Sequence, residues 1–169
     1  MKDGHTTVII SIGSNVERER HLPEAIRLLR RHRRIEVEGV SRFFESKSVG
    51  GPEGAPNFFN AAVKACTDLS PQDLRAELRH IEDVLGRIRT DDPNEPRTID
   101  LDIAYYGDLS KAFDDWSIPD PQAVTHAHVA VPIADVAPTW VHPDTGATAY
   151  ELVAALPTAT QEVHPVMAI

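Results

Sequence analysis

The sequence contains a single cysteine, Cys66, so an internal disulfide is impossible. No apolar run in it approaches the roughly 20 residues that a membrane-spanning helix needs. The apolar run near the N-terminus is also too short for the hydrophobic segment of a secretory signal. We therefore expect a cytoplasmic protein with no membrane-bound segment, in which Cys66 is a small buried core residue.

Basic residues are in the minority, with 17 Lys and Arg against 26 Asp and Glu and a formal net charge of −9. This balance disfavours a non-specific nucleic-acid binder, which is normally basic. The fingerprints of two common nucleotide-binding loops, G-x-x-x-x-G-K-[ST] and G-x-G-x-x-G, are absent as well. A phosphate substrate is still possible, because an acidic protein can concentrate arginines locally.

The 169 residues, 41% of them hydrophobic, have the composition of an ordinary globular domain. The spacing of apolar residues predicts the element order βαββαβ, followed by an irregular, proline-rich part. That order is a split βαβ arrangement, an antiparallel sheet with helices packed on one face. The predicted strands cover 6–13, 35–46, 57–69 and part of 95–108, and the predicted helices cover 20–32, 70–86 and 149–156. We expect one domain over residues 1–157 and a tail over 158–169.

Two carboxylates interrupt the most hydrophobic predicted strand. Asp100 and Asp102 alternate with Leu101 and Ile103, so the aspartates share one face of the strand while the apolar residues face the core. Their Cα atoms should lie about 6.6 Å apart, a separation from which two carboxylates can bind one or two hard cations. An exposed strand face that happens to carry acids explains the pattern equally well.

Arginines surround this strand. Arg87, Arg89 and Arg97 flank a polar loop, and guanidinium groups suit phosphate oxygens at any working pH. Glu82 lies near the C-terminal end of the preceding helix, where a carboxylate opposes the helix dipole unless it is solvated or has a partner. An arginine cluster, two carboxylates and a magnesium-bound polyphosphate are mutually consistent, and the alternative is an ordinary solvated charge cluster.

The segment "PNFFNAAV" places Phe58 and Asn60 on one face of a strand and Phe59 on the other, toward the core. An aromatic ring beside a primary amide suits a flat heterocycle, which the ring can stack on and the amide can hydrogen-bond. The alternative is a core phenylalanine with an asparagine at a strand end.

The segment "THAHV" contains His126 and His128 in an H-x-H pattern. On a strand this pattern can bind zinc, but no third and fourth ligands follow at a known spacing. The histidines expected at the surface are His5, His21, His32, His80 and His164.

The stretch "PRTIDLDIAYYG", preceded by "IEDVLGRIR" and "NFFNAAV", resembles the 6-hydroxymethyl-7,8-dihydropterin pyrophosphokinase family of folate biosynthesis. That family is marked by a P-R-x-x-D-L-D-I strand and an F/Y-x-N-A-A-V strand, and the order of elements matches from Thr6 to about Leu156. The resemblance implies a ferredoxin-like α+β fold with a C-terminal extension. It also implies transfer of pyrophosphate from ATP to the pterin hydroxymethyl group, with release of AMP.

The resemblance implies a role for each matching residue. Asp100 and Asp102 would bind two Mg²⁺ ions and, with Arg87 and Arg97, form the catalytic set. The ATP-binding residues would be Glu82, Arg89, Arg97, Ser117 and His126. The pterin-binding residues would be Ser46, Val49, Phe58, Asn60 and His128. The loops over 48–56 and 90–96 would close over the two small-molecule substrates, and we expect a monomer.

The chain departs from the family pattern in its last third, within "PDPQAVTHAHV". Asp120 stands where the family has His, His126 where it has Arg, and His128 where an aromatic residue would cap the pterin ring. The second loop reads "DPNEP" and lacks the usual Trp and Arg. These departures leave two alternatives open: a divergent relative that acts on another pterin, and a non-catalytic binding module that keeps only the fold.

Overall fold

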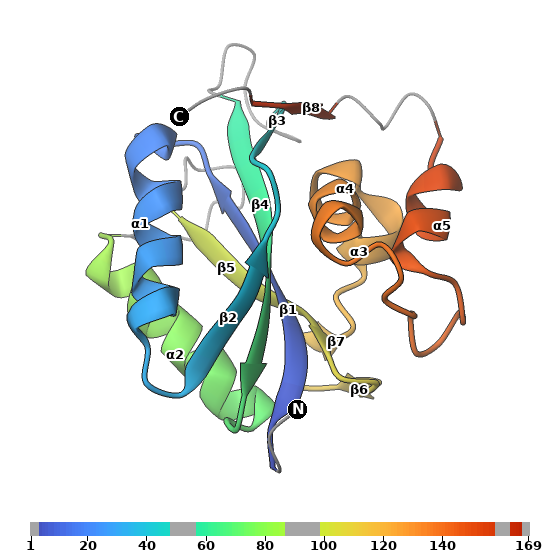
Figure 1. Ribbon diagram of the computed structural model, residues 1–169, viewed down its shortest axis with the longest axis horizontal. Coiled ribbons are helices and arrows are strands. Elements are labelled where there is room, and N and C mark those ends of the chain that lie inside the picture. The colour runs from blue at the N-terminus through green and yellow to red at the C-terminus, as the bar shows by residue number, and fades with distance from the viewer. Residues whose placement is uncertain (1–3, 48–56, 87–98, 158–162, 167–169) are drawn as a thin grey trace.

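A computed structural model describes residues 4–47, 57–86, 99–157 and 163–166 (Figure 1). Its main feature is a six-stranded antiparallel sheet in the order β5-β1-β4-β3-β8, with β2 also paired to β4. The strands of this sheet are β1 (Thr6–Ser14), β2 (Ile35–Val40), β3 (Phe44–Ser46), β4 (Phe58–Thr67), β5 (Asp100–Tyr106) and β8 (Val163–Pro165). The helices are α1 (Arg18–Arg31), α2 (Pro71–Val84), α3 (Gln122–Thr125), α4 (Ala127–Val136) and α5 (Ala149–Ala154). A small hairpin joins β6 (Lys111–Ala112) to β7 (Ser117–Ile118).

The predicted βαββαβ core is confirmed, and the fold is ferredoxin-like α+β. Helices α1 and α2 lie together on one face of the sheet, and α3 to α5 lie on the other (Figure 1). The start of α2 follows from its sequence: the Ser70 hydroxyl accepts a hydrogen bond from the Asp73 N–H at 3.1 Å, and Pro71 occupies the first turn. Gly86, which has φ +85°, follows the helix end.

The expectation of an irregular C-terminal part was wrong between Gln122 and Val136. Helices α3 and α4 form there and cover the second face of the sheet. The reason lies in the sequence of α4, AHVAVPIADV, which is apolar almost all round and includes a proline, so it lacks the amphipathic period that marks a surface helix. The predicted strand 35–46 is likewise split into β2 and β3.

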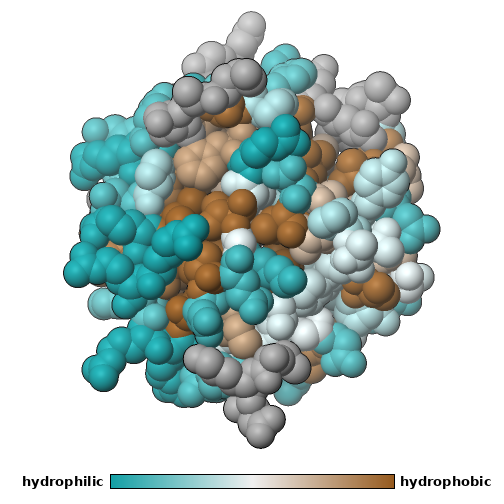
Figure 2. All heavy atoms as spheres, viewed as in Figure 1, coloured by the Kyte–Doolittle hydropathy of each residue, from teal (hydrophilic) through white to brown (hydrophobic). Residues whose placement is uncertain are grey.

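Alternation along β1, β4 and β5 directs side chains into two cores, one on each face of the sheet. Residues such as Val8, Val63 and Leu101 face α1 and α2 in the larger core. Residues such as Ile9 and Ala62 face the other way and pack with α4 in the smaller core. Figure 2 shows hydrophobic residues gathered in the middle of one face of the molecule, with hydrophilic residues over the side where α1 lies.

The alternation of β5 holds for Leu101 and Ile103, which are buried in the larger core as predicted. It changes at Ala104, where the pairing register with β1 shifts by one residue. Ala104 and Tyr105 therefore both belong to the smaller core, because a bulge lets two residues oppose one on the partner strand. Because of this bulge, Tyr105 does not continue the alternation of Leu101 and Ile103.

Two further expectations concern single residues. Cys66 is buried, as predicted. His21 is not at the surface: its side chain is buried, and its Nδ1 lies 2.6 Å from the Val16 carbonyl oxygen.

Of the helices that the structure describes, none combines the length and the apolar character needed to cross a membrane.

Candidate active site

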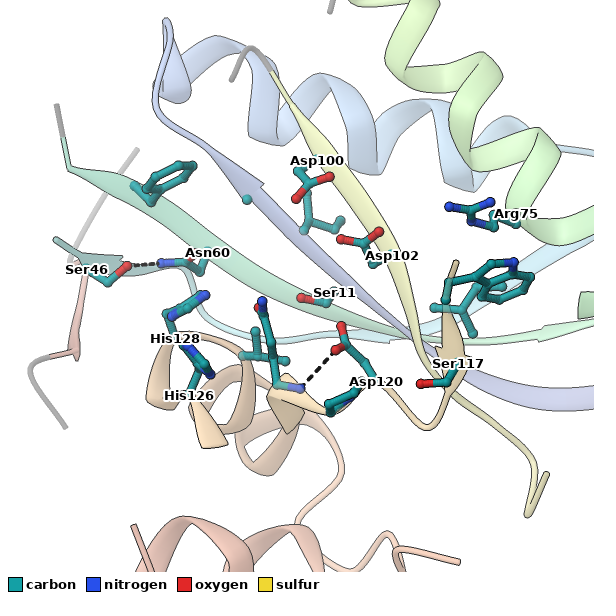
Figure 3. A pocket seen from close by; sticks show the side chains of 18 of the residues that line it. Ser11, Ser46, Asn60, Arg75, Asp100, Asp102, Ser117, Asp120, His126 and His128 are labelled. Atoms are coloured by element: carbon teal, nitrogen blue, oxygen red, sulfur yellow. Dashed lines mark hydrogen bonds between the residues drawn. The ribbon is translucent and has the colours of Figure 1, made fainter. Parts of the chain in front are cut away.

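A cavity of about 790 Å³ opens on the second face of the sheet, beside the part that α4 covers. The same alternation that builds the cores directs side chains into it. Ser11 and Gly13 come from β1, Phe58 and Asn60 from β4, and Asp100 and Asp102 from β5. The rest of the wall is formed by α2, β7 and the segment around α3 and α4, and its described residues include Arg75, Arg79, Trp116, Ser117, Asp120, Gln122, His126 and His128 (Figure 3).

The two aspartates predicted to share a strand face do so, and both line the cavity (Figure 3). Burial, followed by the charge of Asp100, raises the pKa of Asp102 to about 7. Burial also raises the pKa of Asp120, which lies across the cavity, and the charge of Asp100 contributes to that shift. The ionised forms of both carboxylates are therefore disfavoured, and a bound cation would favour them.

The donor set fits magnesium with a bound polyphosphate. Mg²⁺ commonly binds one or two protein carboxylates and completes its shell with water and phosphate oxygens. The residues described here contain no cluster of three or more His, Cys, Asp or Glu side chains suited to a metal ion. Asp100 and Asp102 could supply the one or two carboxylates that such an ion takes, since both line the cavity.

The side chains predicted to bind the heterocycle come from β4, which lies on the other side of β1 from the aspartates of β5. Asn60 is buried, and its Nδ2 donates a hydrogen bond to the Ser46 hydroxyl at 2.7 Å (Figure 3). Phe58 lies on the same face of β4, while Phe59 is buried in the larger core as predicted. The Asn60–Ser46 bond fixes the orientation of the amide.

Gly13 has no side chain, which leaves space in the wall beside Asn60 and Phe58. A Cβ atom at this position would lie 3.4 Å from Asn60 Oδ1 and 3.7 Å from a ring carbon of Phe58. Any larger side chain would therefore fill the space in front of the amide and the ring. The sequence indicated only that Gly13 ends a strand, so this role in keeping the cavity open was missed.

Arg75 and Arg79 were also missed by the sequence analysis. Both lie on α2 one turn apart and line the cavity. The Arg75 guanidinium lies over the Trp116 ring, 4.7 Å from its centroid, and that ring stacks on Phe113 at 4.1 Å. Arg79 Nη2 donates to Asp102 Oδ1 at 3.0 Å. The i, i+4, i+7 spacing of Arg75, Arg79 and Glu82 was the available signal, because it places the three on one helix face.

The altered C-terminal segment also reaches the cavity. His126 and His128 line it from the start of α4, and their rings meet edge to face at 5.3 Å (Figure 3). His126 Nδ1 lies 2.6 Å from the Thr125 hydroxyl. Asp120 accepts a hydrogen bond from the Gln122 N–H at 2.9 Å. The H-x-H pattern thus lies at the start of a helix, so the strand on which a zinc site was considered does not form.

The remaining predicted site residues divide into three groups. Ser46 and Ser117 line the cavity. Glu82 is not among the described lining residues: its side chain is fully buried, and its Oε2 accepts a hydrogen bond from the Leu101 N–H. Predictions for Val49, Arg87, Arg89 and Arg97 concern positions outside the described residues.

Comparison with known proteins gives a consistent result. Residues 9–138 match the family model described as 7,8-dihydro-6-hydroxymethylpterin-pyrophosphokinase. The chain is 33% identical over 139 residues to the 2-amino-4-hydroxy-6-hydroxymethyldihydropteridine pyrophosphokinase of Haemophilus influenzae, covering 82% of this chain and 86% of that protein. It is 40% identical over 119 residues to the enzyme of the same name from Synechocystis, covering 70% of this chain.

Some relatives are longer than the matched region. The chain spans 60% of the Synechocystis protein and 37% of the bifunctional protein FolKE of Lactococcus lactis. Among solved structures, the crystal structure of Plasmodium falciparum HPPK-DHPS with pteroate matches with a TM-score of 0.70. That match covers 89% of this chain and 42% of the other at 12% identity, so it supports the fold alone.

Proposed function

This chain belongs to the 7,8-dihydro-6-hydroxymethylpterin-pyrophosphokinase family, and from that premise we propose that it transfers pyrophosphate from ATP to 6-hydroxymethyl-7,8-dihydropterin in folate biosynthesis. In this reaction the hydroxymethyl oxygen attacks the β-phosphorus of ATP. The bond from that phosphorus to the oxygen bridging the α-phosphate breaks, AMP leaves, and the hydroxyl proton passes to solvent. We also propose that the protein is a cytoplasmic monomer with no nucleic-acid partner.

One observation carries this proposal: the carboxylate pair and the amide–aromatic wall open into the same cavity of about 790 Å³. A charged phosphate chain and a flat heterocycle need different walls, and this cavity has both. Phosphoryl transfer needs little covalent help from a protein, so positioning and charge neutralisation provide most of the catalysis. Two Mg²⁺ ions held by Asp100 and Asp102 would neutralise phosphate charge as the two substrates approach each other.

The chain's own residues would perform the binding and the orientation. Phe58 offers a face for stacking, and Asn60, held by Ser46, presents its amide to the edge of the pterin. Arg75 and Arg79 bring positive charge to the same cavity as the aspartates. The arginines 87, 89 and 97 would supply the remaining charge to the phosphates, as the resemblance implies.

The replacements at Asp120, His126 and His128 favour the second candidate, a relative that acts on another pterin, because all three positions line the cavity. A binding module is disfavoured, since it has no need for two carboxylates crowded beside a phosphate site. Incubation with ATP, Mg²⁺ and a panel of hydroxymethylpterins discriminates among the three. AMP formed only with the dihydropterin supports the proposal, AMP with a different pterin supports the second candidate, and no AMP with any of them supports the third.

Asn60→Ala should weaken pterin binding by roughly 1–3 kcal/mol, because the heterocycle would lose a donor and an acceptor. Calorimetry with α,β-methylene-ATP present measures the pterin affinity, and ATP affinity alone should hardly change. Asn57→Ala is the matched control, since Asn57 is exposed and is not among the described cavity-lining residues. Equal losses of pterin and ATP affinity in Asn60→Ala would mean that Asn60 has a structural role.

His126→Arg should strengthen ATP binding at pH 8. A guanidinium is fully charged at that pH and presents several donors in a planar fork, and a charge-assisted hydrogen bond to phosphate contributes about 1.5–3 kcal/mol. His80→Arg is the control, because it adds the same charge at an exposed position of α2. Similar ATP affinities for both variants and the wild type would place His126 away from the phosphates.

A further inference from the structure

Strand β5 lies at one end of the sheet order, so one of its edges has no neighbouring strand among the described residues. Every backbone group on such an edge needs another partner or water. At Leu101, the residue between the two aspartates, the partners come from helix α2. Both backbone groups of Leu101 are bonded there by side chains.

The two side chains are Glu82 and Arg79. Glu82 Oε2 accepts the Leu101 N–H at 2.7 Å, and Arg79 Nη1 donates to the Leu101 carbonyl oxygen at 2.6 Å. Arg79 Nη1 also donates to Glu82 Oε2 at 2.9 Å, so the pair is itself joined. The two side chains therefore hold this residue as a neighbouring strand would.

A third contact links this arrangement to the carboxylates. Arg79 Nη2 donates to Asp102 Oδ1 at 3.0 Å, so one guanidinium holds a carbonyl of β5 and the side chain of the next residue. The planar fork of arginine makes this possible, because its donors point in fixed directions. Lysine has one ammonium group and cannot reproduce the same set of contacts.

Burial distinguishes this pair from an ordinary helix ion pair. The Glu82 side chain is 0% exposed and that of Arg79 is 25% exposed. An exposed pair such as Arg27 and Glu24 on α1 contributes little to stability. A buried carboxylate costs free energy unless it is well paired, and here its contacts converge on the residue that separates Asp100 from Asp102.

We infer that Arg79 and Glu82 form a positioning clamp that fixes the Leu101 peptides, and through them the relative placement of the Asp100 and Asp102 carboxylates. The Cα atom of Asp100 is bonded to the peptide before Leu101, and the Cα atom of Asp102 is bonded to the peptide after it. Rotation of these two peptides would therefore turn both aspartate side chains. The clamp holds the strand so that both carboxylates remain directed into the cavity. This inference rests on the proposed function and assigns Glu82 a role through Leu101 in place of direct contact with ATP.

Hydrogen exchange at the Leu101 amide tests the Glu82 half of the clamp without metal or substrate. Glu82→Gln keeps an acceptor for that amide, whereas Glu82→Met removes it. We expect Leu101 to exchange slowly in the wild type and in Glu82→Gln, and at least about tenfold faster in Glu82→Met, while β4 amides report global opening. Equal Leu101 exchange in all three proteins, measured relative to β4, would overturn the clamp.

Binding of Mn²⁺ in the presence of α,β-methylene-ATP, followed by electron paramagnetic resonance, tests the Arg79 half. Arg79→Lys keeps the charge but loses the fork, so a changed affinity reports geometry. Mutating a residue that orients metal ligands typically costs about 10- to 100-fold in affinity, and we expect a loss in that range. Arg27→Lys, in the exposed α1 pair, is the matched control and should bind Mn²⁺ like the wild type.

The outcomes separate the clamp from the proposed function. Mn²⁺ affinity within about twofold of the wild type in Arg79→Lys would overturn the clamp. A wild type that binds Mn²⁺ but forms no AMP would overturn the proposed function and leave the clamp supported if the variants behave as expected. Absence of Mn²⁺ binding to the wild type would overturn the proposed function, and hydrogen exchange at Leu101 would then decide the clamp.

Discussion

Asp100→Asn and Asp102→Asn should each abolish AMP formation while the protein remains folded. Each change removes one charged ligand from the proposed metal site, a loss of about 4 kcal/mol of transition-state stabilisation or roughly a thousandfold in rate. Steady-state AMP release at saturating Mg²⁺ measures the effect. Turnover within tenfold of the wild type in either variant would contradict the assignment of these carboxylates to the metal.

The stability of the same variants provides the control. Burial and the neighbouring Asp100 charge raise the pKa of Asp102, so the ionised carboxylate is disfavoured in the metal-free folded protein. For an acid with a raised pKa, this destabilisation is absent below the usual carboxyl pKa of 3.8, grows as the pH rises from there, and is fully present above about 7. Asp102→Asn should therefore unfold at the same or a higher temperature than the metal-free wild type at pH 8. A clearly lower unfolding temperature would indicate a structural role.

Leu101→Ala should lower stability and leave turnover nearly unchanged, the reverse of what we expect for the two aspartate variants. The Leu101 side chain is fully buried in the larger core, on the other face of β5 from the aspartates. Its truncation should lower the free energy of unfolding by about 2–5 kcal/mol, because a cavity is left in a packed interior. Urea denaturation measures this loss, and the folded fraction should keep kcat within a few-fold of the wild type. A stable but inactive Leu101→Ala variant would show that the two faces of β5 are not independent.

Much of this arrangement could be predicted because period-2 alternation is a local property of the sequence. Leu101 and Ile103 were placed in the core and the aspartates on the opposite face, and Phe59 was separated from Phe58 and Asn60 in the same way. The start of α2 could likewise be recognised from Ser70 and Pro71, residues that are typical of a helix N-terminus. Signals of this kind depend only on residues that are close together in the sequence, so a single amino-acid sequence is sufficient to identify them.

The rest depended on contacts between distant segments. Helix α4 was missed because its sequence is apolar on nearly every side and contains Pro132, so no helical period distinguishes it from a loop. The bulge at Ala104 arises from pairing with β1, which the sequence of β5 does not specify. Arg79 meets Asp102 across 23 positions of sequence, and that contact required the packing of α2 against β5. Helix spacing could identify the arginine but not its partner.

The most direct test of the central claim is the stoichiometry of the products. Purified protein is incubated with ATP, Mg²⁺ and 6-hydroxymethyl-7,8-dihydropterin, and the nucleotide and pterin products are quantified by mass spectrometry. We predict one AMP for each pterin that gains two phosphate groups, with no product when EDTA removes the metal. Formation of ADP with a singly phosphorylated pterin, or of AMP without a pterin diphosphate, would contradict the account.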